Sequence, residues 1–95
     1  MAPSTYAAAT FQQLSDATAA IDWFRNQGID PSAIAVAAAP AGEHPRALER
    51  GDNLRTDLTW YVAVEIDRAH LPLAVIRATL RREGGKPTSW TPALA

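Results

Sequence analysis

Residues 11–36, FQQLSDATAAIDWFRNQGIDPSAIAV, decide the fold of this 95-residue chain. Ser15 is predicted to cap a helix, because a serine hydroxyl can accept a hydrogen bond from a first-turn N–H that has no partner within the helix. Gly28 is predicted to end the helix in the left-handed conformation that glycine readily adopts. Between them, apolar side chains recur with helical spacing: Ala17, Ala20, Ile21 and Phe24. The stretch therefore predicts a helix over 15–27.

Strands are predicted on both sides of this helix. Residues 6–11 are interpreted as a first strand, which ends at Phe11. After the helix, the sequence Asp-Pro-Ser at 30–32 is typical of a turn. Residues 33–39 follow with Ile34 and Val36 alternating with alanines, which indicates a second strand. Together these segments predict a strand–helix–strand unit.

The clearest strand lies over residues 58–66, where bulky apolar side chains alternate strictly with other residues. Pro72 is predicted to begin the last helix, with residues 67–71 as a connection. The glycine pair at 84–85 is predicted to end it. Residues 88–91 are considered as a short fourth strand within a C-terminal tail over 86–95.

These elements predict a single α+β domain over residues 1–95, with a polar tail at 1–5. Their order corresponds to a ferredoxin-like fold, in which two helices lie on one face of a small mixed or antiparallel sheet. The alternative is a three-stranded sheet with the C-terminal tail unpaired. A domain of this size buries only about 60–65% of its unfolded surface, so oligomerisation would add stability.

Composition excludes several classes of function. Nine basic and ten acidic side chains give a net charge of −1, which argues against an electrostatic hold on nucleic acid or anionic lipid. The chain has no cysteine, so disulfides and thiolate sites are excluded. We see no signal-peptide pattern at the N-terminus, and no apolar run approaches the roughly 18 residues of a spanning helix. We therefore expect a soluble cytoplasmic protein with no nucleic-acid or membrane partner.

Residues 41–57 form a long connection rich in charged side chains. Within it, residues 45–50 are predicted to form one helical turn with proline at its first position. Connections of this length are usually either functional or disordered, and the sequence leaves both open. The candidate functional residues of this loop are Glu43, His44, Arg46, Arg50 and Arg55.

The sheet is expected to turn its bulky side chains toward the helices and its small ones outward. The outward set is a candidate interaction surface: Ala33, Ala35, Ala37, Tyr61 and Ala63. A flat face of methyl groups suits close packing against another sheet, which favours a homodimer or a protein partner. Two alternatives remain open, namely an alanine-rich composition without a role and a tail that folds over this face from Thr88 onward.

We find no catalytic constellation in the sequence. His44 and His70 lack the spacing of metal ligands, and no serine lies in a nucleophile elbow. Trp60 and Tyr61 are adjacent on one strand and must point to opposite faces, so they cannot form a base-stacking pair. We expect no enzymatic activity, no cofactor and no metal.

Several of these residues resemble the bacterial general stress protein domain, also called the heat-induced stress proteins. The similar positions are Phe11, the helical alanines with Ile21 and Phe24, Gly28-Ile29, Asp30-Pro31 and the Ile34–Val36 pair. Residues 62–66 and 80–85 look like the second half of that family. The resemblance implies a small domain of two helices and a sheet, with a stress-associated role and no catalytic residues.

Two functions are consistent with these features. The first is a non-enzymatic, stress-associated domain that acts through homodimerisation or a protein partner, using the alanine-rich face and the 41–57 loop. The alternative is a small-molecule-sensing regulatory domain similar to ACT ligand sensors, which share this order of elements and bind ligands at dimer interfaces. An enzyme like the small ferredoxin-like monooxygenases would need His44 or His70 beside a cavity.

Overall fold

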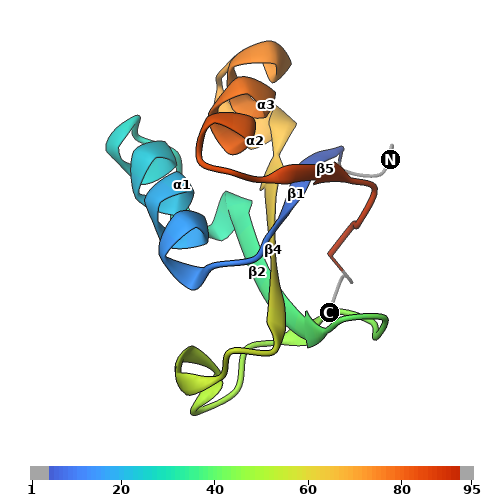
Figure 1. Ribbon diagram of the computed structural model, residues 1–95. Coiled ribbons are helices and arrows are strands. Elements are labelled where there is room, and N and C mark those ends of the chain that lie inside the picture. Colours follow the sequence, from blue (N-terminus) through green and yellow to red (C-terminus); the bar gives the residue numbers. More distant parts are fainter. Residues whose placement is uncertain (1–4, 93–95) are drawn as a thin grey trace.

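Two central strands, β1 and β4, organise a five-stranded antiparallel sheet in the computed structural model, which describes residues 5–92 (Figure 1). The strands are β1 (Tyr6–Phe11), β2 (Ile34–Pro40), β3 (Arg46–Ala47), β4 (Leu58–Glu65) and β5 (Lys86–Thr88). They lie in the order β3-β2-β4-β1-β5, and every neighbouring pair is antiparallel. The protein is therefore α+β. The three-stranded alternative is wrong, because β5 pairs with β1.

The helices cover one face of this sheet (Figure 1). They are α1 (Leu14–Asn26), the single turn α2 (Ile66–Ala69) and α3 (Leu73–Arg82), with short 3₁₀ helices η1 (Pro31–Ala33) and η2 (Asp52–Leu54) in the connections. The predicted strand over 58–66 is one residue too long, because Ile66 begins α2. The predicted connection over 67–71 likewise contains most of this helical turn.

The alternation predicted for residues 58–66 is confirmed over β4 by its register with β1. Three cross-strand pairs belong to the core beneath the helices: Phe11–Trp60, Ala9–Val62 and Ala7–Val64. The largest side chains that are almost completely buried are Phe11, Phe24, Ile76, Val62 and Val64. These come from β1, β4, α1 and α3, so the core lies between the sheet and the two longer helices.

The ends of α1 show one wrong prediction and one confirmed one. Gln13 rather than Ser15 is the N-cap residue, and its carbonyl accepts hydrogen bonds from the N–H groups of Asp16 and Ala17, both at 3.2 Å. Leu14 packs against the core, so the helix begins one residue earlier than predicted and Ser15 lies inside its first turn. Gly28 has φ +87° and closes the helix as predicted.

Gly85 joins α3 to β5 at a place without room for a side chain. A Cβ atom there would lie 2.7 Å from Phe11 Cζ and 2.8 Å from the Leu80 carbonyl oxygen. Glycine therefore allows the chain to pass from the helix directly into the sheet. As a result, the fourth strand of the prediction lies at Lys86–Thr88 rather than at 88–91. Pro87 is tolerated in it because β5 is an edge strand.

Candidate functional site

Four of the five residues predicted as an interaction surface lie on the face of the sheet that turns away from the helices. We call this the second face. The register sets Ala35 opposite Ala63, and Ala37 opposite Tyr61. Ala35 and Tyr61 are half-buried, whereas Ala37 and Ala63 are buried. The structure therefore brings these four residues together, but it leaves only two of them partly accessible.

Ala33 does not belong to the second face, and its prediction there is wrong. The Asp30 carboxylate accepts a hydrogen bond from the Ser32 N–H at 2.9 Å, and Pro31 begins η1. The N–H of Ala33 then bonds to the Asp30 carbonyl at 2.8 Å. This turn delays the start of β2 to Ile34, and Ala33 joins the core on the helix side. Hydrogen bonds from Ser32, first from its N–H, lower the pKa of the Asp30 carboxyl.

The C-terminal segment (residues 89–92) lies across the second face. Figure 1 shows it running from β5 along the side of the sheet opposite the helices. Trp90 meets Tyr61 edge to face, with 5.6 Å between ring centroids and 64° between ring planes. The alternative of a tail folded over this face therefore holds for residues 89–92. Residues 93–95 lie outside the described residues.

The outer edge of β2 is the part of this sheet that stays open. β3 pairs only with Ala37 and Ala38, so within residues 5–92 no strand lies beside Ile34, Ala35 and Val36 on that side. These three residues are half-buried, whereas the following three are buried. Backbone N–H and C=O groups along such an edge are available to another chain.

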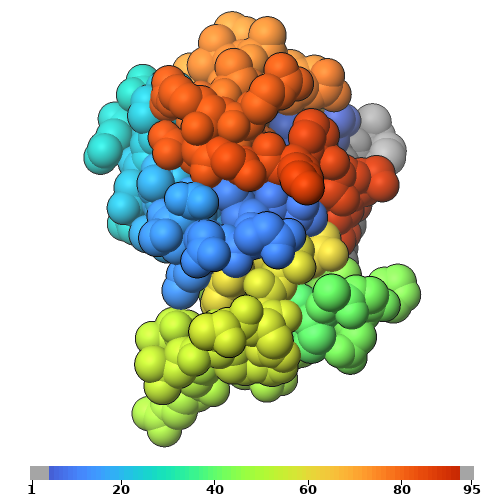
Figure 2. Space-filling model, in the orientation of Figure 1, coloured from blue at the N-terminus to red at the C-terminus, as the bar shows by residue number. Residues whose placement is uncertain are grey.

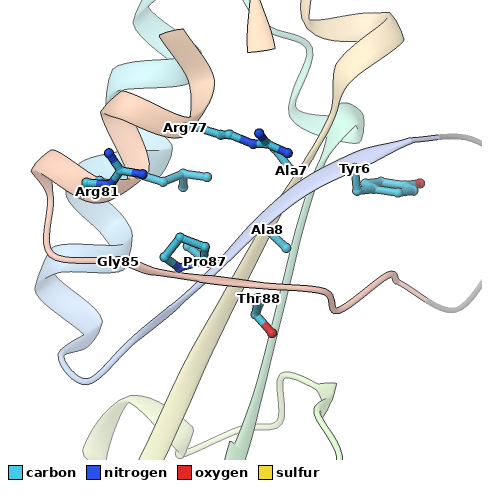
Figure 3. A pocket seen from close by; sticks show the side chains of 10 residues that line it. Tyr6, Ala7, Ala8, Arg77, Arg81, Gly85, Pro87 and Thr88 are labelled. Atoms are coloured by element: carbon cyan, nitrogen blue, oxygen red, sulfur yellow. The ribbon is translucent and has the colours of Figure 1, made fainter. Parts of the chain in front are cut away.

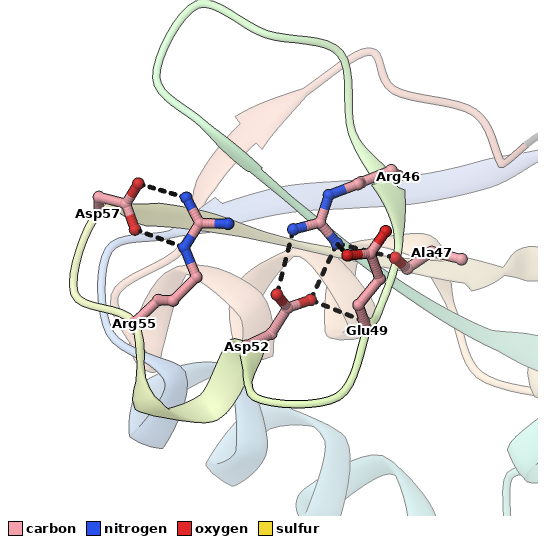
Figure 4. Close-up of polar contacts among 6 residues, drawn as sticks. All are labelled: Arg46, Ala47, Glu49, Asp52, Arg55 and Asp57. Atoms are coloured by element: carbon pink, nitrogen blue, oxygen red, sulfur yellow. Dashed lines mark hydrogen bonds and ion pairs between the residues drawn. The ribbon is translucent and has the colours of Figure 1, made fainter.

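An ion pair between Arg46 and Asp52 closes the 41–57 loop (Figure 4). The Arg46 guanidinium donates two hydrogen bonds to the Asp52 carboxylate, at 2.9 and 3.1 Å. The Glu49 N–H donates a third, at 2.7 Å. These bonds, that from Arg46 first, lower the pKa of the Asp52 carboxyl to about 2. Arg46 therefore holds the shape of the loop.

The helical turn predicted over 45–50 is wrong. Arg46 and Ala47 instead form β3, opposite Ala38 and Ala37 of β2. A weak local preference for helix is overridden here, because β2 offers backbone partners and Asp52 fixes the Arg46 side chain. Figure 2 shows that the loop projects from the body of the protein as a separate knob.

The remaining candidate residues of the loop do not gather into one site. Arg55 donates to Asp57 at 2.9 Å, and this bond lowers the pKa of the Asp57 carboxyl. Arg50 is exposed and has no ion pair within residues 5–92. Glu43 and His44 reach the second face, where they line a hollow, and Arg46 lines a neighbouring hollow together with His44.

Two hollows flank Trp90 on the second face. One, of about 290 Å³, is lined by Glu43, His44, Tyr61 and Trp90, among others. The other, of about 400 Å³, extends from Trp90 to Ala35 at the edge of β2. The sequence prediction did not name Trp90 as a member of this site, because it considered 88–91 as a short strand and kept the covering tail only as an alternative. Its signal in the sequence is a large aromatic residue within an otherwise polar segment.

The histidines do not form a metal site within the described residues, where no group of three or more metal-ligating side chains occurs. His44 lines both hollows. His70 ends α2 in the left-handed conformation, with φ +57°, and is exposed. In the same part of the chain, no helix has both the length and the apolar character required to cross a membrane.

No protein-family model matches the sequence, and comparisons with curated proteins and with solved structures give no match either. The similarity to general stress protein domains therefore stays a prediction from the residues that carry it. Function has to be inferred from the geometry of the sheet, its open edge and its second face.

Proposed function

We propose that this protein is a non-enzymatic domain that acts by association, with a second copy of itself or with another protein, through the outer edge of β2. The observation that carries this proposal is the stretch Ile34–Val36, which has no neighbouring strand within the described residues. Edge strands are commonly protected by charged residues, proline or bulges. This stretch has neither a charged residue nor proline.

A second copy of the chain fits this edge by symmetry. Antiparallel pairing about a two-fold axis at Ala35 would set this residue opposite its own copy and Ile34 opposite Val36. Such a contact is isologous, as in most homodimers, and it would continue the sheet across both chains. The small side chain of Ala35 allows close approach on the second face.

The ferredoxin-like assignment belongs to the same proposal. It is supported by the position of β4 between β1 and β2, the two strands that are connected through α1. The stress-associated role is supported by the sequence resemblance alone. A cytoplasmic location is also part of the proposal.

The test is the mass in solution of the wild-type chain and of the Ala35→Lys variant. We expect light scattering to give twice the chain mass of 10.2 kDa for the wild type. The variant should be monomeric, because like charges directly opposite each other across paired strands are destabilising. Ala19→Lys is the matched control, since Ala19 is exposed on α1, away from the sheet. A monomeric wild type, or a dimer that survives Ala35→Lys, would overturn self-association through this edge.

A second candidate function is ACT-like sensing of a small molecule. It is favoured by the two hollows of about 290 and 400 Å³ beside Trp90, one of which reaches the open edge of β2. A thermal-shift screen with amino acids and nucleotides tests it, because a ligand that binds only the folded state raises the melting temperature as its concentration increases. A dose-dependent rise that Trp90→Ala abolishes would favour sensing. The absence of any rise would count against sensing of these ligands.

A further inference from the structure

A small hollow lies between α3 and the N-terminal half of β1, on the side of the sheet opposite the β2 edge. It has a volume of about 120 Å³ (Figure 3). It exists because β5 ends at Thr88, opposite Ala8, so Tyr6 and Ala7 have no strand beyond them on that side within residues 5–92. Its floor is formed mainly by small or apolar groups: Ala7, Ala9, Leu80, Gly85 and Pro87.

Two arginines line this hollow. Arg77 and Arg81 are four residues apart on α3, which brings their side chains to the same face of the helix. Figure 3 shows the Arg77 side chain extending from α3 toward Ala7 on β1. Like charges at this spacing mildly destabilise a helix.

Neither arginine has a carboxylate partner among the described residues. The neighbouring Arg82 differs, since it lies 3.7 Å from the Glu83 carboxylate and stacks over the Trp23 ring at 5.5 Å. No acidic side chain lines the hollow. Within residues 5–92, Arg77 and Arg81 therefore present two guanidinium groups without an ion-pair partner beside an apolar floor.

We propose that this hollow binds a short-chain carboxylate, with the carboxylate on the Arg77 guanidinium, Arg81 adding positive charge at the rim, and the aliphatic part against Leu80 and Pro87. Guanidinium groups bind carboxylates through strong, charge-assisted hydrogen bonds. A cavity of about 150 Å³ can hold benzene, so a hollow of about 120 Å³ suits a ligand of a few carbon atoms. A phosphate ion has no aliphatic part for the floor, and its higher charge makes desolvation more costly.

Titration with butyrate, followed by the backbone amide signals of Ala7 and Gly85, tests this proposal. We expect saturable chemical-shift changes with a dissociation constant in the millimolar range, because a ligand with few non-hydrogen atoms makes few contacts. Replacing both arginines (Arg77→Gln with Arg81→Gln) should weaken binding by at least about tenfold. Both side chains are exposed, so the variant should retain the wild-type far-ultraviolet circular dichroism.

Two controls distinguish specific binding in the hollow from nonspecific electrostatic attraction of anions. Arg25→Gln, at an exposed position of α1, should leave butyrate binding unchanged, and the neutral analogue butyramide should not bind. Absence of saturation, equal binding of butyramide, or inorganic phosphate binding as tightly as butyrate would each overturn the proposal. None of these results depends on the oligomeric state, so the outcome is independent of association through β2.

Discussion

The two faces of the sheet are buried in different ways. The helix-covered face carries large apolar side chains, such as Phe11, Val62 and Val64, which are almost completely shielded by α1 and α3. The second face carries mainly alanines, and Trp90 on a short segment is the largest group laid against it. Burial of a large apolar side chain contributes more to stability than burial of an alanine, because more apolar surface is removed from water. Most of the folding free energy should therefore come from the helix side.

The strongest test of this difference is the Phe11→Ala variant. Phe11 is 1% exposed, and truncation of a buried phenylalanine typically costs about 3–5 kcal/mol. Urea unfolding should show this loss in the free energy of unfolding. Phe11→Leu fills more of the space and should lose less. A loss below about 1 kcal/mol for Phe11→Ala would contradict the assignment of the main core to this side.

A smaller loss is expected for Trp90→Ala on the second face. Its edge contact with Tyr61 belongs to a class of aromatic pairs that contributes about 0.5–1.5 kcal/mol beyond burial. The same urea experiment should therefore give a modest decrease, and Trp90→Phe should restore part of it. If Trp90→Ala destabilised the protein as much as Phe11→Ala does, the second face would be an equal part of the core.

The smallest expected effect is the loss of the Asp52 ion pair in the 41–57 loop at low pH. The pKa of Asp52 is lowered from 3.8 to about 2. The stability that the ionised Asp52 carboxylate contributes is therefore fully present above the pKa that this group has in the unfolded chain. That stability is lost as the pH falls through the pKa of Asp52 in the folded protein. The amide signal of Glu49, which donates to Asp52, should titrate with a midpoint near pH 2, while methyl signals of Val62 and Val64 stay unchanged. Asp52→Asn should abolish the transition. A midpoint at the unfolded value would show that the Arg46 ion pair is absent in solution.

Local periodicity accounts for the parts of the fold that the sequence predicts. The strand over 6–11 and the alternation over 58–65 are confirmed because a buried face imposes a period of two on the chain. The glycine ends of α1 and α3 are confirmed because Gly28 and Gly84 both have positive φ. These features depend on residues that are close in sequence.

The remaining features depend on contacts that periodicity does not report. β3 forms because β2 is alongside it, and Trp90 rests on Tyr61, which is 29 residues earlier in the chain. For the same reason the candidate site is only partly predictable. Ala35 and Tyr61 share the second face as expected, but the approach of His44 to that face and the position of Trp90 depend on contacts that no local pattern encodes. The wrong assignment of Ala33 has a local cause, the turn made by Asp30 and Ser32.

The position of β1 has a consequence for synthesis of the protein. This strand comes from residues 6–11, yet its two neighbours are β4 and β5, which end at Glu65 and Thr88. During translation it leaves the ribosome long before either partner, and such distant pairing slows folding. The nascent chain therefore carries an unpaired, alanine-rich strand at least until β4 has emerged, and unpaired strands of this kind are prone to aggregate during folding.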